Sequence, residues 1–422
     1  MANDTPITII GAGIAGLALA LALARQGASV TLLEQAAEIK DIGAGIQISP
    51  NGMAVLDALG LGPALRQASL TARAVHLRDG ATDRAVLTLD LARHRTGRGF
   101  HLIHRADLIG LLRSAVVDAG VVIRLNHKVD RVCLTGPVPV LHLGLGGTWD
   151  APLLIGADGL NSSVRAALNG PEAPFFTHQV AWRATIPNDT ILNDMGTPPQ
   201  VEVHMGPGRH LVSYPLRGGT LRNIVAVEER REWAAESWSL RDDTGNLQTA
   251  FAGFSPKVRG WLAQVNAPHL WGLFRHPVAQ VWQKAMPAAG VGGGVALVGD
   301  AAHPMLPFLA QGANMALEDA WVLAQCLADR ADMTQSLTAY QALTAHQPLT
   351  AYQAARKTRT TAVVVAANRN ARAYHLSGPV RTAAHLALRL GGRLAPNAAL
   401  KRFDWIYDHD VTANVQNPSK DF

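Results

Sequence analysis

Three glycines near the N-terminus have the spacing of a phosphate-binding turn. They read Gly11-x-Gly13-x-x-Gly16, and Glu34 follows them after a second apolar run. The first glycine permits a tight turn, the second lets the backbone approach a pyrophosphate, and the third lets a helix pack closely on a strand. The Glu34 carboxylate can accept hydrogen bonds from both hydroxyls of an adenosine ribose. These residues therefore predict a dinucleotide site.

The elements needed to position this turn surround it. Residues 6–10 form a β-branched run typical of a buried strand, residues 14–26 an Ala/Leu-rich helix that ends at Gly27, and residues 29–33 a second strand. This βαβ unit explains why residues 6–24 lack a charge, which would otherwise suggest a signal peptide or a membrane span.

Composition excludes several classes of protein. The chain has 422 residues, of which 48% are hydrophobic and 17% charged, so it can bury a large α/β domain with an insertion and is not disordered as a whole. It has only two cysteines, Cys133 and Cys326. Two cysteines are too few for a disulfide-stapled secreted fold or a multi-cysteine metal site. We therefore expect no bound metal and a cytoplasmic location.

The formal charge of +6 is concentrated near the C-terminus. Residues 340–402 carry ten Lys or Arg and no Asp or Glu, which leaves 28 basic and 32 acidic residues elsewhere. We expect a solvated basic helix face, and a partner or an anionic membrane surface is the alternative. Membrane contact is disfavoured because no Trp or Phe anchors accompany the charges, and no nucleic-acid recognition motif is present.

Two later motifs each follow an apolar run. The first is Asp158-Gly-Leu-Asn-Ser-Ser-Val-Arg165, and the second is Gly299-Asp-Ala-Ala-His-Pro304, which continues into Ala310-Gln-Gly-Ala-Asn-Met-Ala-Leu-Glu-Asp-Ala320. With the glycine turn, these motifs resemble the three ordered signatures of the flavoprotein aromatic hydroxylases, the single-component FAD monooxygenases. The resemblance covers almost the whole chain. It is greatest to the hydroxylases of salicylate, 3-hydroxybenzoate and 6-hydroxynicotinate, through residues 42–51, 103–108, 210–215 and 404–408.

The resemblance implies FAD as the cofactor and suggests which residues hold it. Asp300 would bond the ribityl chain, and the backbone N–H groups at 312–314 would form a positive helix end beneath the reduced flavin. Asp158 and Arg165 would support FAD and nicotinamide binding, with a structural salt-bridged turn as the alternative. His303 is expected to be structural. The remaining cofactor residues implied are Gly45, Gln47, Arg105, Val129, Pro307, Gly312, Ala313 and Asn314.

The resemblance also implies the reaction. NADH or NADPH reduces FAD, O2 forms a C4a-hydroperoxide, and its terminal oxygen passes to an electron-rich ring carbon of an aromatic substrate. The nicotinamide would bind without its own Rossmann domain, because the glycine-dense stretch 290–294 precedes a strand instead of opening a helix. A ubiquinone-pathway-type hydroxylase, or an FAD-dependent oxidoreductase without ring hydroxylation, is the alternative.

His210 and Tyr214 are the expected catalytic pair. They lie four residues apart on one expected strand and so share a face. By resemblance they face the substrate, with His210 as the base for a phenolic proton and Tyr214 as its orienting partner; a packed sheet pair is the alternative. Arg183, Arg209 and Arg222 are candidates to bind a substrate carboxylate, none favoured over the others, and a surface position is the alternative for each. The particular ring, the position hydroxylated and any loss of carboxylate stay open.

These observations predict an α/β architecture: a Rossmann-like FAD-binding domain, an inserted antiparallel β-sheet substrate domain and C-terminal helices. The FAD domain is expected over residues 1–170 and 277–345. The substrate domain is expected over 171–276, where short alternating runs and most of the tryptophans occur, and the helical segment over 346–422. By resemblance, a homodimer is expected.

Overall fold

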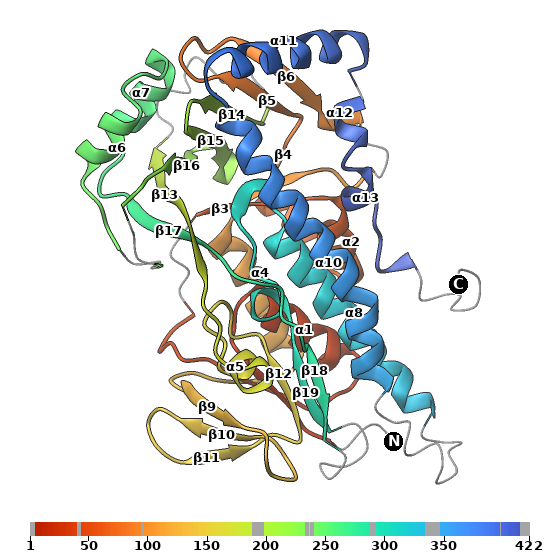
Figure 1. Cartoon of the computed structure of the whole chain (residues 1–422). Coiled ribbons are helices and arrows are strands. Elements are labelled where there is room, and N and C mark those ends of the chain that lie inside the picture. The colour runs from red at the N-terminus through yellow and green to blue at the C-terminus, as the bar shows by residue number, and fades with distance from the viewer. Residues whose placement is uncertain are drawn as a thin grey trace.

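A six-stranded, mostly parallel sheet forms the base of the molecule (Figure 1). The computed structural model describes residues 5–39, 44–93, 97–187, 198–232, 236, 240–286, 293–333, 347–396 and 398–413. The expected loop around residue 290 and the expected domain boundary near residue 345 fall outside this part. In sheet order the strands are β18 (Gln283–Ala285), β19 (Gly294–Leu297), β12 (Leu153–Gly156), β1 (Ile7–Ile10), β2 (Val30–Leu33) and β8 (Val122–Arg124).

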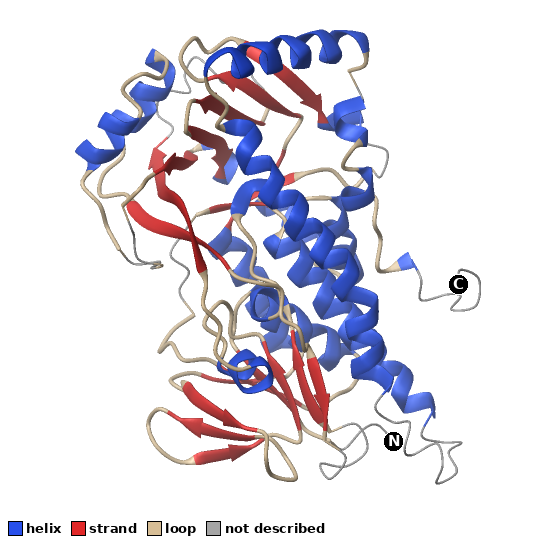
Figure 2. Ribbon diagram, viewed as in Figure 1, coloured by secondary structure: helices blue, strands red, loops and turns tan. Residues whose placement is uncertain are grey.

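Helices cover this sheet because its strands are apolar on both faces (Figure 2). The helix α1 (Ile14–Arg25) is buried from Ile14 through Leu23, between the sheet, α4 (Arg105–Asp118) and α8 (Gly312–Met333). An Ala/Leu helix that is apolar all round is stable only in such a position. The Rossmann-like α/β fold predicted from the sequence is thus confirmed.

A seven-stranded sheet forms the upper body. The helices α6 (Thr244–Ala250) and α7 (Pro256–Ala263) pack on one of its faces through Phe251 and Trp261. In sheet order its strands are β17 (His269–Arg275), β13 (Phe175–Pro187), β16 (Leu221–Glu229), β15 (Arg209–Leu216), β14 (Gln200–Gly206), β5 (Ala74–Asp79) and β6 (Ala85–Asp90).

This sheet is not built from residues 171–276 alone. The strand β5 pairs in parallel with β14, and β6 pairs with β5, so residues 74–90 complete a sheet that we had expected to come from the inserted segment. Alternation within residues 70–90 indicates a strand but not its partner, because pairing across more than a hundred residues depends on tertiary contacts. The division of the chain into domains stays a prediction.

In the described part of the chain, two three-stranded sheets and further helices complete the fold. The strand β3 (Gly45–Ile48) pairs with β7 (His101–His104), which also pairs with β4 (Leu70–Thr71). The other described elements are β9 (Val129–Cys133), β10 (Val140–Leu143), β11 (Thr148–Asp150), α2 (Pro50–Ala58), α3 (Gly62–Ala68), α5 (Ser163–Asn169), α10 (Gln347–Tyr374), α11 (Gly378–Leu394), α12 (Ala398–Lys401), α13 (Asp404–Tyr407) and the 3-10 turns η1 (Leu91–Arg93), η3 (Arg217–Gly219), η5 (Gly299–Ala301) and η6 (Pro307–Leu309).

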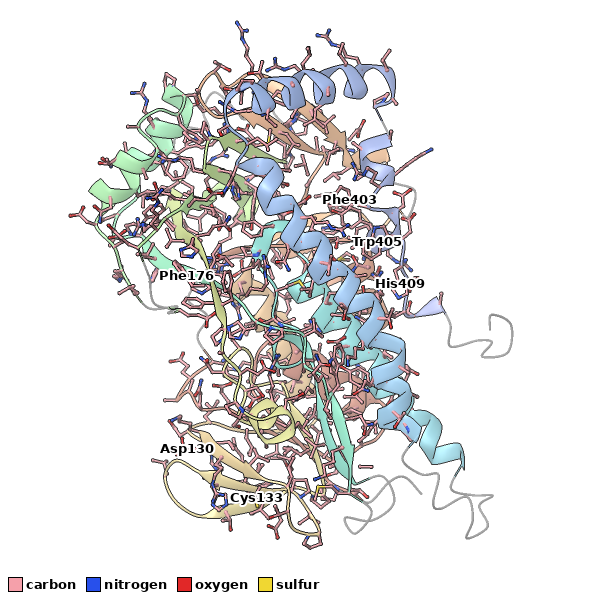
Figure 3. All side chains as sticks on the ribbon, viewed as in Figure 1. Asp130, Cys133, Phe176, Phe403, Trp405 and His409 are labelled. Carbon is pink, nitrogen blue, oxygen red and sulfur yellow. The ribbon has the colours of Figure 1, made fainter. Side chains whose placement is uncertain are left out.

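The basic C-terminal segment is a solvated basic face only in part, because Arg369, Arg393, Lys401 and Arg402 are exposed whereas other basic residues are engaged in the fold. Arg356 on α10 is buried, and Arg359 donates to the backbone oxygens of Trp405 and Ile406, which holds α13 beside α10 (Figure 3). The outward side of α11 is apolar, with Leu386, Leu390 and Leu394 exposed, among others. In the described part of the chain, no helix is long and apolar enough to cross a membrane.

Candidate active site

The glycine turn forms an open cradle at the N-terminus of α1. Gly11 has φ +102°, and a Cβ there would lie 2.4 Å from the backbone oxygen of Ala157; a Cβ on Gly16 would lie 1.9 Å from the backbone oxygen of Gly11. A Cβ on Gly13 would meet nothing within 4 Å. The N-terminus of α1 has no side-chain cap. Two glycines therefore permit the fold, whereas Gly13 leaves space beside free N–H groups, as a pyrophosphate requires.

Glu34 lies at the edge of this cradle. Its carboxylate accepts hydrogen bonds from the backbone N–H groups of Ala12 (2.8 Å) and Ala36 (2.9 Å), which fix it beside the turn. A carboxylate has about four lone-pair sites, so capacity is left for ribose hydroxyls. Val129 begins β9 nearby, since His127 just before it donates from its backbone N–H to the oxygen of Glu34 (2.8 Å).

Replacement of Gly13 by alanine should weaken FAD binding without unfolding the protein. The new methyl group has room in the chain but occupies the closest approach of the pyrophosphate. We expect FAD affinity to fall by about tenfold or more, equivalent to roughly 1.4 kcal/mol, measured by flavin fluorescence titration of the apoprotein. Gly16→Ala is the contrasting variant, because its methyl group would clash with Gly11 and reduce stability even without FAD. Unchanged FAD affinity in Gly13→Ala would place the pyrophosphate elsewhere.

Asp300, Arg105 and Gly312 converge at the other end of the expected cofactor site. The Asp300 side chain is exposed to solvent, yet the protein packed around it raises the pKa of its carboxyl, while His303 and Arg105 act in the opposite direction. A Cβ on Gly312 would lie 3.9 Å from Oδ1 of Asp300, so the start of α8 adjoins this carboxyl.

The start of α8 presents backbone donors to the same place. The first N–H bonded within the helix is that of Met315, which donates to the oxygen of Gln311 (2.8 Å). By helix geometry, the N–H groups of Gly312, Ala313 and Asn314 have no intrahelical acceptor. Their positive helix end suits the anionic edge of a reduced flavin. The cradle at Gly13 and this helix end together fit FAD.

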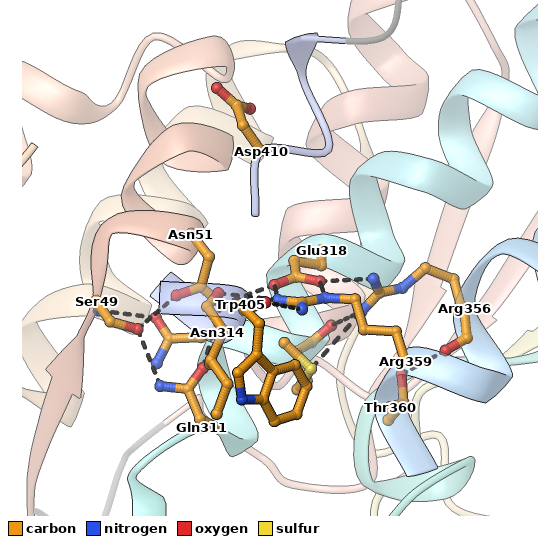
Figure 4. Close-up of polar contacts among 12 residues, drawn as sticks. Ser49, Asn51, Gln311, Asn314, Glu318, Arg356, Arg359, Thr360, Trp405 and Asp410 are labelled. Carbon is orange, nitrogen blue, oxygen red and sulfur yellow. Dashed lines mark hydrogen bonds and ion pairs between the residues drawn. The ribbon is translucent and has the colours of Figure 1, made fainter. Parts of the chain in front are cut away.

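The side chain of Asn314 is engaged in the fold rather than free for a ligand (Figure 4). It donates to the backbone oxygens of Gln47 (3.1 Å) and Ala310 (2.9 Å) and accepts from the N–H of Ser49 (3.0 Å). It thereby joins β3 and the turn before α2 to the first turn of α8. Gln47 lies on β3, to which the Asn314 amide is bonded. Pro307 begins η6, which ends directly before Ala310, the other residue to which this amide donates.

A buried ion network lies behind the same helix, and sequence analysis did not predict it. Arg356 donates to Glu318 (2.5 Å) and to Asp319 (2.8 Å), and Arg359 donates to Glu318 (2.9 Å) (Figure 4). His303 also contacts Asp319. Burial alone would raise the pKa of both carboxyls. Arg356 and Arg359 lower the pKa of Glu318 below its usual range, and His303 and Arg356 do the same for Asp319. His303 therefore has the structural position that we expected.

Asp158 and Arg165 are also held within the fold. Asp158 accepts from the N–H of Ser163 (2.8 Å) at the start of α5, and burial raises the pKa of its carboxyl. Arg165 is buried, contacts Glu172, and donates to the backbone oxygens of Ala301 (3.2 Å) and Pro277 (2.5 Å). These contacts favour the structural turn with a salt bridge, and a cofactor role for this motif stays a prediction.

The register of the seven-stranded sheet shows which side chains share the face of His210. His210 lies opposite Val227, which lies opposite Ala181, which lies opposite Trp271. Residues directly opposite each other point to the same face. The rings of His210 and Phe308 have centroids 5.7 Å apart, and Ala181, Val227, Trp271, Leu306 and Phe308 form one apolar cluster. This face of the sheet is therefore directed at η6.

The next rows of the sheet place Tyr214 and one arginine on that face. Tyr214 lies opposite Asn223, and Arg183 lies opposite Val225, which lies opposite Val212. Val212 is midway between His210 and Tyr214, so Arg183 shares their face. Its guanidinium lies over the Trp271 ring, 4.8 Å from the centroid.

The other two arginine candidates lie on the opposite face. Arg222 donates to Ser213 (3.1 Å) and covers the Trp261 ring of α7, 4.5 Å from its centroid. Arg209 immediately precedes His210 on the strand, so it points the other way, where it contacts the oxygen of Ala250 and pairs with Glu228 at 3.3 Å. The sequence could not separate the three arginines, because the choice depends on strand register.

The protonation states of the expected catalytic pair follow from burial. Burial and the neighbouring His375 lower the pKa of His210 well below its usual value, so the imidazole is neutral and can accept a proton. Burial raises the pKa of Tyr214, so its hydroxyl stays protonated and can donate. The Tyr214 ring adjoins Gly45, where a Cβ would lie 2.5 Å from it, and Asn223 accepts from the Gly45 N–H (2.8 Å).

Comparison with known proteins identifies the family. The family model described as "FAD binding domain" matches residues 4–366. The chain is 33% identical to 3-hydroxybenzoate 6-hydroxylase of Klebsiella oxytoca over 92% of this chain and 93% of that one, and 36% identical to a 3-amino-4-hydroxybenzoate 2-monooxygenase of Streptomyces platensis over 78% and 81%. A solved salicylate hydroxylase in complex with substrate superposes with a TM-score of 0.77 and 25% identity, over 97% and 96% of the two chains. With a glycine cradle and a helix end that fit FAD, the chain belongs to the FAD-binding family of aromatic hydroxylases and is an FAD-dependent monooxygenase.

Proposed function

We propose that this protein hydroxylates the ring of a phenolic or heteroaromatic carboxylic acid. The observation that carries the proposal is the sheet register that brings His210, Tyr214 and Arg183 to one face, directed at η6. A base, a hydroxyl donor and a cation are the groups needed to bind and activate an aromatic ring with a hydroxyl and a carboxylate. The relatives named above act, by their names, on hydroxybenzoates.

Each group has a defined task in this proposal. Bound FAD, reduced by NADH or NADPH, supplies the oxygen-transfer chemistry. His210 takes the proton of the ring hydroxyl at Nε2, which raises the electron density of the ring. Tyr214 donates a hydrogen bond that orients the substrate, and Arg183 binds its carboxylate. The apolar cluster of Leu306, Phe308 and Trp271 excludes water from the reacting atoms.

The direct test uses the FAD-loaded protein with a panel of hydroxybenzoates, hydroxylated heteroaromatic acids and the corresponding phenols without carboxylate. We expect some of the acids to stimulate NADH or NADPH oxidation and O2 uptake, and to gain one oxygen atom by mass spectrometry. NAD(P)H oxidation that no ring acid stimulates would contradict the proposal. The same assay decides between NADH and NADPH. A cytoplasmic location and a homodimer stay predictions.

Arg183→Ala should weaken the binding of carboxylated rings selectively. The lost hydrogen bond to a charged group corresponds to roughly 1.5–3 kcal/mol, so we expect KM for the acid to rise about ten- to hundredfold and KM for the matching phenol to change little. Arg222→Ala is the matched control, because that guanidinium lies on the opposite face against Trp261. If both variants change the acid-to-phenol ratio of KM equally, Arg183 does not bind the substrate carboxylate.

A further inference from the structure

Behind His210, two side chains from distant parts of the chain form a continuous hydrogen-bonded path to the surface. Nδ1 of His210 lies 2.7 Å from Nε2 of His375, and Nδ1 of His375 lies 2.8 Å from Oε1 of Glu229. His210 is buried, the His375 side chain is only 2% exposed, and the Glu229 side chain is 52% exposed. The path therefore begins at the expected base and ends in solvent.

The backbone fixes this arrangement. Glu229 ends β16 two residues beyond Val227, the residue opposite His210, so it shares the face of His210. His375 directly follows α10, and its backbone oxygen accepts from the N–H of Gly208 (3.1 Å). The oxygen of Gly208 in turn accepts from the N–H of Glu229 (2.8 Å). The end of α10 is thus tied to the hairpin between β14 and β15, with the His375 ring between the other two side chains.

The hydrogen bonds determine which ring nitrogen of each histidine carries a proton. The Glu229 carboxylate only accepts, so His375 donates to it from Nδ1 and presents an unprotonated Nε2 to His210. His210 must then donate from its own Nδ1, which leaves the lone pair on Nε2. Among the residues that the structure describes, no hydrogen-bond partner is found for this Nε2. The path therefore holds His210 in the tautomer that can act as a base.

We propose that His375 and Glu229 form a proton relay that sets the tautomer of His210 and carries the proton of the ring hydroxyl to solvent. This inference rests on the proposed function. The substrate O–H bond breaks and a bond to Nε2 of His210 forms; the Nδ1 proton of His210 moves to Nε2 of His375; and the Nδ1 proton of His375 moves to Glu229, which releases it to water. No electrons are transferred. When the product oxygen takes a proton back from His210, the same steps run in reverse and restore the starting tautomers.

The relay is tested on the FAD-loaded protein without NAD(P)H, so that ionisation of the ring hydroxyl is observed apart from turnover. The probes are 4-nitrophenol and hydroxybenzoates, whose phenolate absorbance is followed by stopped-flow after a pH jump. We expect phenolate formation to be roughly 10²-fold slower in both His375→Ala and Glu229→Gln, at the lower end of general acid–base effects. His385→Ala is the matched control, a buried histidine beside the carboxylate of Asp79 (3.5 Å) but outside the path.

Chemical rescue separates a relay from a packing role. In His375→Ala, added imidazole should restore the rate of phenolate formation, whereas 1-methylimidazole should not, because it fills similar space but cannot both accept and donate a proton. Wild-type rates in both path variants, or equal rescue by the two compounds, would overturn the relay and leave the proposed function intact. If no probe binds to the wild-type protein, the relay and the proposed function are both overturned.

Discussion

His210→Ala is expected to lower the rate of ring hydroxylation by roughly 10²–10⁴-fold, the usual contribution of a general base, while FAD remains bound. The reason is positional: His210 is the neutral, buried imidazole on the face directed at η6, and its Nε2 has no hydrogen-bond partner among the described residues. The glycine cradle and the start of α8 do not involve His210, so the cofactor site should be intact. Product formation, O2 uptake and FAD content measure the two effects separately.

A matched variant sharpens this result. His210→Gln can still hydrogen-bond to His375 but cannot take up a proton, so it should lose nearly as much activity as His210→Ala. Ligand binding, measured by flavin difference spectra, should be much less affected than kcat. If rate and coupling are unchanged in both variants, His210 is a packing residue of the sheet and not the base.

The pH profile gives an independent measurement of the same group. Burial, reinforced by His375, lowers the pKa of His210 below the ordinary value of 6.5. The neutral form is the active one, so activity should persist well below pH 6.5 and decline only as the pH falls through the lowered pKa. An acidic limb at or above pH 6.5 in kcat/KM would indicate a different base.

Arg356→Met should produce the largest loss of stability. Arg356 is 1% exposed and pairs with two buried carboxylates, Glu318 and Asp319, so its removal leaves negative charge buried without its main partner. Breaking a buried pair in this way typically costs about 3–5 kcal/mol. We expect a corresponding fall in the free energy of unfolding, measured by urea denaturation of the apoprotein. FAD content should also fall, because the network lies behind the start of α8.

Arg369→Met is the control for this prediction. Arg369 is an exposed arginine on the same helix, and a surface substitution of this kind usually changes stability by no more than about 0.5 kcal/mol.

The pKa values of Glu318 and Asp319 are lowered in the folded protein, so the network stabilises the wild type above their ordinary pKa values of 4.5 and 3.8. This stabilisation is lost as the pH falls through the lowered values. Equal stability of the two variants at neutral pH would contradict the prediction.

The sequence by itself determined the fold class and predicted the residues of the FAD site. Gly11, Gly13 and Gly16, with Glu34, could be interpreted because their spacing, strand and helix all lie within about 30 residues. Asp300 and the start of α8 were predicted from the resemblance to the family, whose motif at this place is also local in sequence. The shared face of His210 and Tyr214 follows from the two-residue period of one strand. In each case the geometry is set by neighbouring residues, so it can be derived without knowing the partners.

Only the tertiary structure decided which distant residues lie together around the proposed site. Register between β13, β16 and β15 placed Arg183, and not Arg209 or Arg222, on the sheet face that carries Tyr214. The packing of α10 brought Arg356 to Glu318 and Asp319, and its end brought His375 between His210 and Glu229. Such pairs are separated by tens to hundreds of residues. Their proximity depends on strand register and helix packing, which a one-residue shift would change completely, and local periodicity does not specify either.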